Sequence, residues 1–368
     1  MGDTKAYWIA FHRVPRIGAA RFRLLIRAFG DLETAWRAPA KELAAVGLGP
    51  RTLESLLATR DRMDPDAEAE AAFKAGYQVL TWEDDAYPAR LREIPTPPPV
   101  LFVAGSILSK DETAVALVGT RNPTTYGLDA TDELSQGFAR AGVTVVSGLA
   151  RGIDSQAHQS ALRAGGRTFA VLGSGLDRIY PQEHRGLANE ISRSGAVLSD
   201  YPLGTGPDPR NFPPRNRLIS GLAMAIVVVE AGDESGALLT AEFAAAQARP
   251  VFAVPGTIHS GKSRGTNALI AAGARPALSA HTVLADLHLA GSIVPAVETA
   301  LAPTDEVERA LWEELGQGPS NADELARTCR RTASEVSSAL AMMEMRGDVR
   351  RVGAALFERG RSPGHAVS

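Results

Sequence analysis

Two short segments carry side chains suited to phosphates and bases. Gly119-Thr120-Arg121 combines glycine, a hydroxyl and a guanidinium. Glycine lets a ligand approach the backbone closely, and arginine can hold a phosphate with two parallel hydrogen bonds. Phe212, Arg215 and Asn216 stand together in a segment expected to be a proline-rich loop before a helix. A base stacks on an aromatic ring for about 1–3 kcal/mol regardless of sequence. Taken alone, Gly119-Thr120-Arg121 favours an ordinary strand-to-helix turn with a surface arginine, whereas the Phe212 segment favours a contact with nucleic acid.

Further candidates flank these segments. Arg210 precedes Phe212, and Ser235-Gly236 is expected to open a helix whose free N–H groups suit a phosphate. Each candidate also has a structural alternative. Ser235 could simply cap its helix, Phe212 could anchor a loop, and Arg215 could form an internal ion pair.

Two other patterns are weaker. Asp154 and His158 are four residues apart on one helix face, but no third metal ligand is near them, so a structural role is expected. Residues 256–263, GTIHSGKS, match the phosphate-loop pattern GxxxxGK[ST]. We expect no ATPase, because residues 263–266 are predicted to continue as loop instead of opening a helix. Residues 173–178 lack the third glycine of a dinucleotide fingerprint, so no cofactor is predicted.

A parallel sheet is expected to position these residues. Buried apolar runs alternate with helical segments between residues 113 and 280, which indicates a doubly wound α/β domain. The expected strands are Thr113–Val118, Val143–Ser147, Thr168–Leu172, Ala196–Ser199, Ala225–Glu230 and Val251–Val254. Glycine-rich turns follow several of them, at the edge where such sheets bind ligands.

The two ends predict smaller units. Residues 1–65 indicate short helices with two turn–helix units, at 15–25 and 46–53, typical of helix-hairpin-helix (SAM-like) domains. Residues 305–360 indicate three helices and a hairpin, a winged helix. Its third helix is poor in base-reading donors, so DNA binding and protein docking remain alternatives. The sheet domain is expected over 66–285, a linker over 286–304 and a tail over 361–368.

Composition limits the function classes. The 368 residues have a net charge of −3, so any nucleic-acid surface must be local. The single cysteine, Cys329, excludes an intramolecular disulfide and cysteine-based metal sites, and with no apparent signal segment it predicts a cytoplasmic protein. No apolar run is long enough to predict a membrane span.

The order of the central motifs resembles the DNA processing protein A (DprA/Smf) family. The resemblance rests on VALVGTRNPTTYG from Val115, VSGLARGIDSQAH from Val146, FPPRNRLISGL from Phe212, VEAGDESGALLTA from Val229, and Val254-Pro-Gly with the following GTNALIAAGA. It covers about residues 77–280, and only architecture matches at the ends. It implies an extended Rossmann-like domain that binds single-stranded DNA with the Gly-Thr-Arg turn and the Phe212 segment.

The resemblance also implies partners. It suggests a homodimer formed through the Rossmann-like domain, a RecA recombinase partner, and a role in natural transformation that includes displacement of single-strand-binding protein. Binding of double-stranded DNA is left open. The alternative is a small-molecule nucleotide enzyme of the same fold class, although Pro255-Gly256 lacks the second adjacent glycine that such enzymes use.

Overall fold

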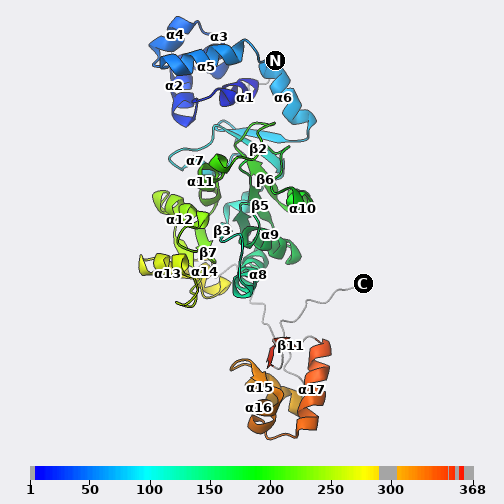
Figure 1. Cartoon of the computed structure of the whole chain (residues 1–368). Coiled ribbons are helices and arrows are strands. Elements are labelled where there is room, and N and C mark those ends of the chain that lie inside the picture. The colour runs from blue at the N-terminus through cyan, green and yellow to red at the C-terminus, as the bar shows by residue number, and fades with distance from the viewer. Residues whose placement is uncertain (1–4, 290–304, 347, 353–355, 360–368) are drawn as a thin grey trace. The chain divides into compact units, whose positions relative to one another are not determined.

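The computed structural model describes residues 5–289, 305–346, 348–352 and 356–359 (Figure 1). Residues 1–293 form one compact unit and residues 294–368 a second. Most of the expected linker and the whole expected tail lie outside the described residues. The finer domain boundaries stay predictions.

A nine-stranded sheet forms the centre of the first unit, in the order β1-β2-β6-β5-β4-β3-β7-β8-β9. Seven neighbouring strands are parallel, and β2 and β1 extend the sheet antiparallel beyond β6. The expected strands are present, β6 with its expected bounds and each of the others with one end shifted by one or two residues. Their bounds are β1 (Gln78–Thr81), β2 (Val100–Gly105), β3 (Ala114–Val118), β4 (Thr144–Ser147), β5 (Thr168–Val171), β6 (Ala196–Ser199), β7 (Ala225–Val228), β8 (Val251–Ala253) and β9 (Arg275–Pro276).

Helices cover both faces of the sheet, as predicted for a doubly wound domain (Figure 1). Val115 and Leu117 of β3 pack in the core beneath α8, α9 and α14, whereas Ala116 and Val118 pack in the core beneath α11 and α12. Alternate side chains of a strand point to opposite faces, so β3 is buried on both sides. The helices of this domain are α7 (Ala89–Arg92), α8 (Thr125–Arg140), α9 (Ile153–Arg163), α10 (Arg185–Ser194), α11 (Phe212–Leu222), α12 (Gly236–Ala246), α13 (Arg264–Ala271) and α14 (Ala280–Asp286).

Six short helices make up the helical module, residues 5–74. They are α1 (Lys5–Arg13), α2 (Ala19–Phe29), α3 (Leu32–Arg37), α4 (Ala40–Ala45), α5 (Pro50–Arg60) and α6 (Pro65–Lys74). The two expected turn–helix units are present, with Gly18 directly before α2 and Gly49 directly before α5.

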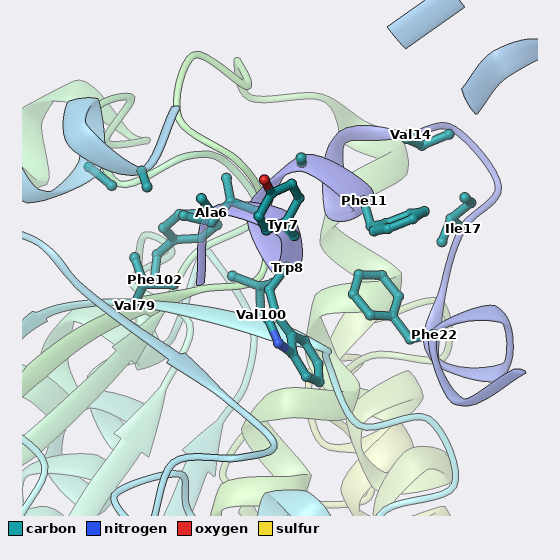
Figure 2. Close-up of a cluster of buried hydrophobic side chains, with 14 of the residues drawn as sticks. Ala6, Tyr7, Trp8, Phe11, Val14, Ile17, Phe22, Val79, Val100 and Phe102 are labelled. Carbon is teal, nitrogen blue, oxygen red and sulfur yellow. The ribbon is translucent and has the colours of Figure 1, made fainter. Parts of the chain in front are cut away.

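The helical module shares its hydrophobic core with the sheet. Figure 2 shows Trp8, Phe11 and Phe22 of the module in one cluster with Val100 and Phe102 of β2. The centre of the Trp8 ring lies 5.5 Å from the centre of the Phe22 ring and 5.7 Å from that of Trp82, which follows β1. The module is therefore fixed to the sheet by apolar packing.

The second unit is a winged helix, as predicted. Its elements are α15 (Glu306–Glu314), β10 (Ser320–Asn321), α16 (Ala322–Thr328), α17 (Ala333–Arg346), β11 (Val349–Val352) and β12 (Leu356–Arg359), and β12 lies between β10 and β11. Four arginines form ion pairs with carboxylates of this unit: Arg331, Arg346, Arg350 and Arg351. These pairs reduce the positive charge that the winged helix offers to DNA.

Candidate functional site

The connections of the sheet reverse direction between β3 and β7, and ligands bind at such points beside the carboxyl ends of the strands. A hollow of about 690 Å³ lies there, which we call the groove. Its lining includes every predicted site residue except Arg210. The predicted residues on the lining are Gly119, Thr120, Arg121, Phe212, Arg215, Asn216, Ser235 and Gly236. Tyr180, Glu234 and Lys262 also lie on it.

The Gly119-Thr120 turn is held in place by contacts to neighbouring segments. The Thr120 amide donates to the Glu230 carbonyl oxygen (2.8 Å), and the Thr120 carbonyl accepts from the Ile153 amide (3.2 Å). A Cβ atom on Gly119 would lie 2.6 Å from Cγ1 of Ile153, so the turn needs glycine. The Glu230 carboxylate is buried and accepts from the Thr124 amide (2.9 Å) and hydroxyl (2.5 Å) at the start of α8. The turn is therefore preorganised without a ligand.

Arg121, Phe212 and Tyr180 form a mixed aromatic and cationic surface at the groove. The guanidinium carbon of Arg121 lies 5.6 Å from the centre of the Phe212 ring, within the range of a cation–π interaction. The Tyr180 ring centre is 5.7 Å from that of Phe212, with 33° between the ring planes. Among the described residues, Arg121 has no carboxylate within ion-pairing distance. A base and its phosphate could therefore engage the ring and the guanidinium together.

Two glycines make room for the floor of the groove. A Cβ atom on Gly173, after β5, would lie 2.8 Å from Cδ1 of Phe212. A Cβ atom on Gly148, after β4, would lie 2.7 Å from Nη2 of Arg215. The glycine-rich strand ends thus admit α11 side chains as well as leaving space for a ligand.

Arg215 is buried under the groove, with only 5 % of its surface exposed. Its Nη1 donates to the carbonyl oxygens of Gly148 (2.8 Å) and Val171. Burial lowers the pKa of Arg215 and raises the pKa of the buried Asp154, while each opposite charge counteracts the other shift. The predicted contact of Arg215 with DNA stays a prediction, and the hydrogen bonds show a supporting role.

The opposite wall of the groove is the start of α12. Nδ2 of Asn216 donates to the Gly236 carbonyl oxygen (3.3 Å), and Oδ1 of Asn216 accepts from Nε of Arg215 (3.3 Å). The Ser235 hydroxyl accepts from the Ala237 amide (3.4 Å), so the capping alternative is present in the structure. Gly236 is exposed to solvent in the first turn.

Arg210 is separate from this cluster. It is not among the residues that line the groove, and its side chain is 89 % exposed and paired with Asp208 (2.6 Å). That ion pair lowers the pKa of Asp208 to about 2. The structure therefore does not bring Arg210 together with the other predicted residues.

Asp154 and His158 have structural partners. Asp154 accepts from the amides of Gly148 (3.2 Å) and Ala150 (3.4 Å), whereas Nδ1 of His158 lies 2.7 Å from the Thr168 hydroxyl. Burial lowers the pKa of His158 to about 3, so the ring is neutral. Within the described ranges, no group of three or more His, Cys, Asp or Glu residues is placed to hold a metal ion.

One expectation about the phosphate-loop pattern is wrong. Residues 263–266 do not continue as loop, because α13 begins at Arg264, directly after Ser263. The segment nevertheless uses many of its amides internally. The amides of Gly256, Ser260, Ser263 and Gly265 donate to protein acceptors, whereas a phosphate loop directs its amides at the ligand. Lys262 donates to the Asn122 carbonyl oxygen.

Three residues that serve the groove were absent from the predicted set. Tyr180 follows a loop after β5 and is 39 % exposed, and its apposition to Phe212 has no signal in sequence spacing. Glu230 could have been found as a carboxylate at the end of a buried strand. The sequence indicates Lys262 only as part of the phosphate-loop pattern, whereas in the structure it lines the groove.

Comparison with known proteins agrees with the observed fold. The model of the family described as DNA recombination-mediator protein A matches residues 78–288, and the DprA winged helix domain matches residues 295–354. The chain belongs to the DNA recombination-mediator protein A family. Protein Smf of Synechocystis is 40 % identical over 308 residues, which cover 82 % of this chain and 77 % of that protein.

Two solved structures of the family share the fold. DNA processing protein A of Streptococcus pneumoniae is 34 % identical, with a TM-score of 0.67 over 77 % of this chain and 97 % of that one. The Helicobacter pylori protein is 30 % identical, with a TM-score of 0.52 over 58 % of this chain and 95 % of that one. That structure is described as showing a single-stranded DNA binding mode. No helix in the described part of the chain is long and apolar enough to cross a membrane.

Proposed function

We propose that this protein binds single-stranded DNA without sequence preference in the groove at the carboxyl edge of β3 and β7. The surface formed by Arg121, Phe212 and Tyr180 carries this proposal, because it offers an exposed cation beside two aromatic rings. Base stacking supplies sequence-tolerant binding, and Arg121 and Lys262 supply charge for phosphates. Gly119, Thr120, Asn216, Ser235 and Gly236 shape the walls.

The biological step we propose is loading of RecA recombinase onto DNA that enters the cell during natural transformation. A homodimer formed through the Rossmann-like domain would place two grooves on one strand and help to displace single-strand-binding protein. Family membership supports this step. Its direct test measures the ATPase activity of RecA on DNA coated with single-strand-binding protein. We expect the wild-type protein to speed the onset of this activity, and the double variant described below to leave the onset slow.

The groove is tested by titrating a fluorescent oligothymidine at two salt concentrations. Wild-type protein should bind tightly and more weakly as salt rises, since phosphate contacts release counterions. The double variant Arg121→Ala/Phe212→Ala should lose most of this affinity. The matched control, Arg140→Ala/Phe73→Ala, changes the same residue types at exposed positions outside the groove. Equal loss in both double variants would refute the assignment of the groove.

A further inference from the structure

The groove alone carries little exposed positive charge. Arg121 and Lys262 are its cations, apart from the buried Arg215, and the exposed Glu234 lies on the same lining. Sequence-independent binding of a polyanion depends mainly on phosphate contacts. This shortage directs attention to other cationic surfaces beside the groove.

A second hollow, of about 1490 Å³, lies between the helical module and the sheet domain. We call it the cleft. The turn between α1 and α2 and the end of α5 line one side, and the segments at residues 96–99 and 200–205 line the other. Its charged lining consists of Arg13, Arg16, Arg21, Arg62 and Arg217 with Glu68 and Asp200.

The charges of the cleft do not cancel. Glu68 is paired with Arg13 (2.7 Å) and Asp200 with Arg217, so both acids of the lining are already neutralised. Arg16 and Arg62 are exposed, and neither has a carboxylate within ion-pairing distance among the described residues. Arg21 donates to the Arg16 carbonyl oxygen, which leaves its charge uncompensated. The cleft therefore has a surplus of guanidinium groups, which suit phosphodiesters.

The cleft and the groove lie on either side of the first turn of α11. Pro213 lines the groove, and the next residue, Pro214, lines the cleft. A strand held by Phe212 can therefore continue past this turn into the cleft without crossing the domain.

We infer that the cleft is a second phosphate-binding surface, in which Arg16, Arg21 and Arg62 hold the backbone of the single strand that leaves the groove. This inference rests on the proposed function, since the groove supplies the strand. It gives the helical module a direct role in binding DNA. It also explains how a groove with few cations belongs to a binder that does not read sequence.

The test compares Arg16→Gln/Arg62→Gln with a matched control, Arg27→Gln/Arg51→Gln. The control removes two exposed arginines of the same module that do not line the cleft. Each protein is titrated with an oligothymidine of about six nucleotides, which fills one groove, and with one of about twenty, which reaches further. Circular dichroism melting checks that all variants are folded.

We expect the cleft variant to bind the long oligonucleotide about tenfold more weakly than the control at low salt. The plot of log affinity against log salt should become shallower, its negative slope shrinking in magnitude by about 1.4, because two phosphate contacts to a single strand are lost. Affinity for the short oligonucleotide should equal that of the control.

Three outcomes would overturn the inference, and they are distinguishable. If wild-type protein binds both oligonucleotides through Arg121 but the cleft variant behaves as its control, the cleft assignment fails and the groove assignment stands. If folded wild-type protein binds neither oligonucleotide, the proposed function fails, and the inference fails with it. Equal weakening for the short and long oligonucleotides would also contradict a path that enters the cleft only beyond the groove.

Discussion

The guanidinium carbon of Arg121 lies 5.6 Å from the centre of the Phe212 ring, although the two residues follow different strands of the sheet. Tyr180 lies against the same ring, so Phe212 contacts a cation and a second aromatic side chain. These two contacts restrict the orientation of the Phe212 ring before any base arrives. Binding then has less side-chain entropy to lose.

Phe212→Ala should weaken oligothymidine binding by about 1–3 kcal/mol, because it removes a stacking surface. The salt dependence should stay unchanged, since no cation is lost. Phe212→Tyr should retain most of the affinity, and Phe73→Ala, at an exposed site on α6, should behave as wild type. Fluorescence anisotropy at several salt concentrations measures both quantities. A changed salt slope in Phe212→Ala would mean that the ring mainly positions Arg121.

Gly173→Ala should reduce DNA affinity by displacing the Phe212 ring. The new Cβ atom would lie 2.8 Å from Cδ1 of Phe212, closer than non-bonded carbon atoms approach each other. Gly186→Ala is the matched control, because a Cβ atom there meets no atom within 4 Å and the residue lies inside α10. That control should leave binding unchanged and stabilise the fold by about 0.5–1 kcal/mol. Undiminished binding by Gly173→Ala would show that the ring position is unimportant.

Arg215→Met should destabilise the fold by about 3–5 kcal/mol. It leaves the carbonyl oxygens of Gly148 and Val171 without this donor and Asp154 without its nearby positive charge. Arg210→Met, at a highly exposed site, should change the free energy of unfolding by less than about 0.5 kcal/mol. Urea unfolding measures both. An Arg215 variant that unfolds like wild type but binds no DNA would instead assign this side chain to direct contact.

Acid should destabilise the protein through His158. Burial holds the pKa of this ring at about 3, against an ordinary value of 6.5, so the unfolded chain binds the proton more tightly. Stability is therefore complete above pH 6.5 and falls as the pH is lowered towards 3, by about 2 kcal/mol at pH 5.

His158→Asn tests this origin, because its amide can replace the Nδ1 contact to the Thr168 hydroxyl without titrating. The variant should lose less stability between pH 7 and pH 5 than wild type does. His281→Asn, at an exposed site on α14, should keep the wild-type pH profile. Identical profiles for all three proteins in urea unfolding would rule out His158 as the titrating group.

The protein should release no phosphate from ATP, with or without oligothymidine. The phosphate-loop pattern is present and α13 follows it, but the amides of Gly256, Ser260 and Ser263 donate to protein acceptors. A phosphate-release assay checks this expectation. Hydrolysis that is present in wild type and absent in Lys262→Ala would contradict it.

Sequence patterns predict the sheet and its ligand-binding edge well, for a physical reason. Strands buried on both faces are continuous apolar runs, and Ala196–Ser199 was predicted with its observed bounds. The position of the Gly119-Thr120-Arg121 turn can be predicted because Gly119 comes directly after the last residue of such a strand, Val118. Phe212 and Asn216 were expected in a proline-rich loop before a helix, and that expectation is wrong because α11 begins at Phe212. Pro213 and Pro214 occupy the first helical turn, where proline is tolerated because no backbone N–H is needed there.

Contacts between distant segments could not be predicted in the same way. Burial of Arg215 depends on the space left by Gly148, which only the packed structure reveals. Tyr180 reaches Phe212 from an irregular loop, where no periodicity indicates direction. The start of α13 was missed because a short helix that begins after a glycine-rich loop has a weak local signal.

The shared core of Trp8, Phe22, Val100 and Phe102 makes the helical module an inseparable part of the sheet domain. Deleting the module would expose the apolar side chains of β1 and β2 to water, at the edge of the sheet. Such an edge invites association between copies of the truncated chain. The two parts should therefore melt in a single cooperative transition, and a lineage that lost the module would need compensating polar substitutions along β2.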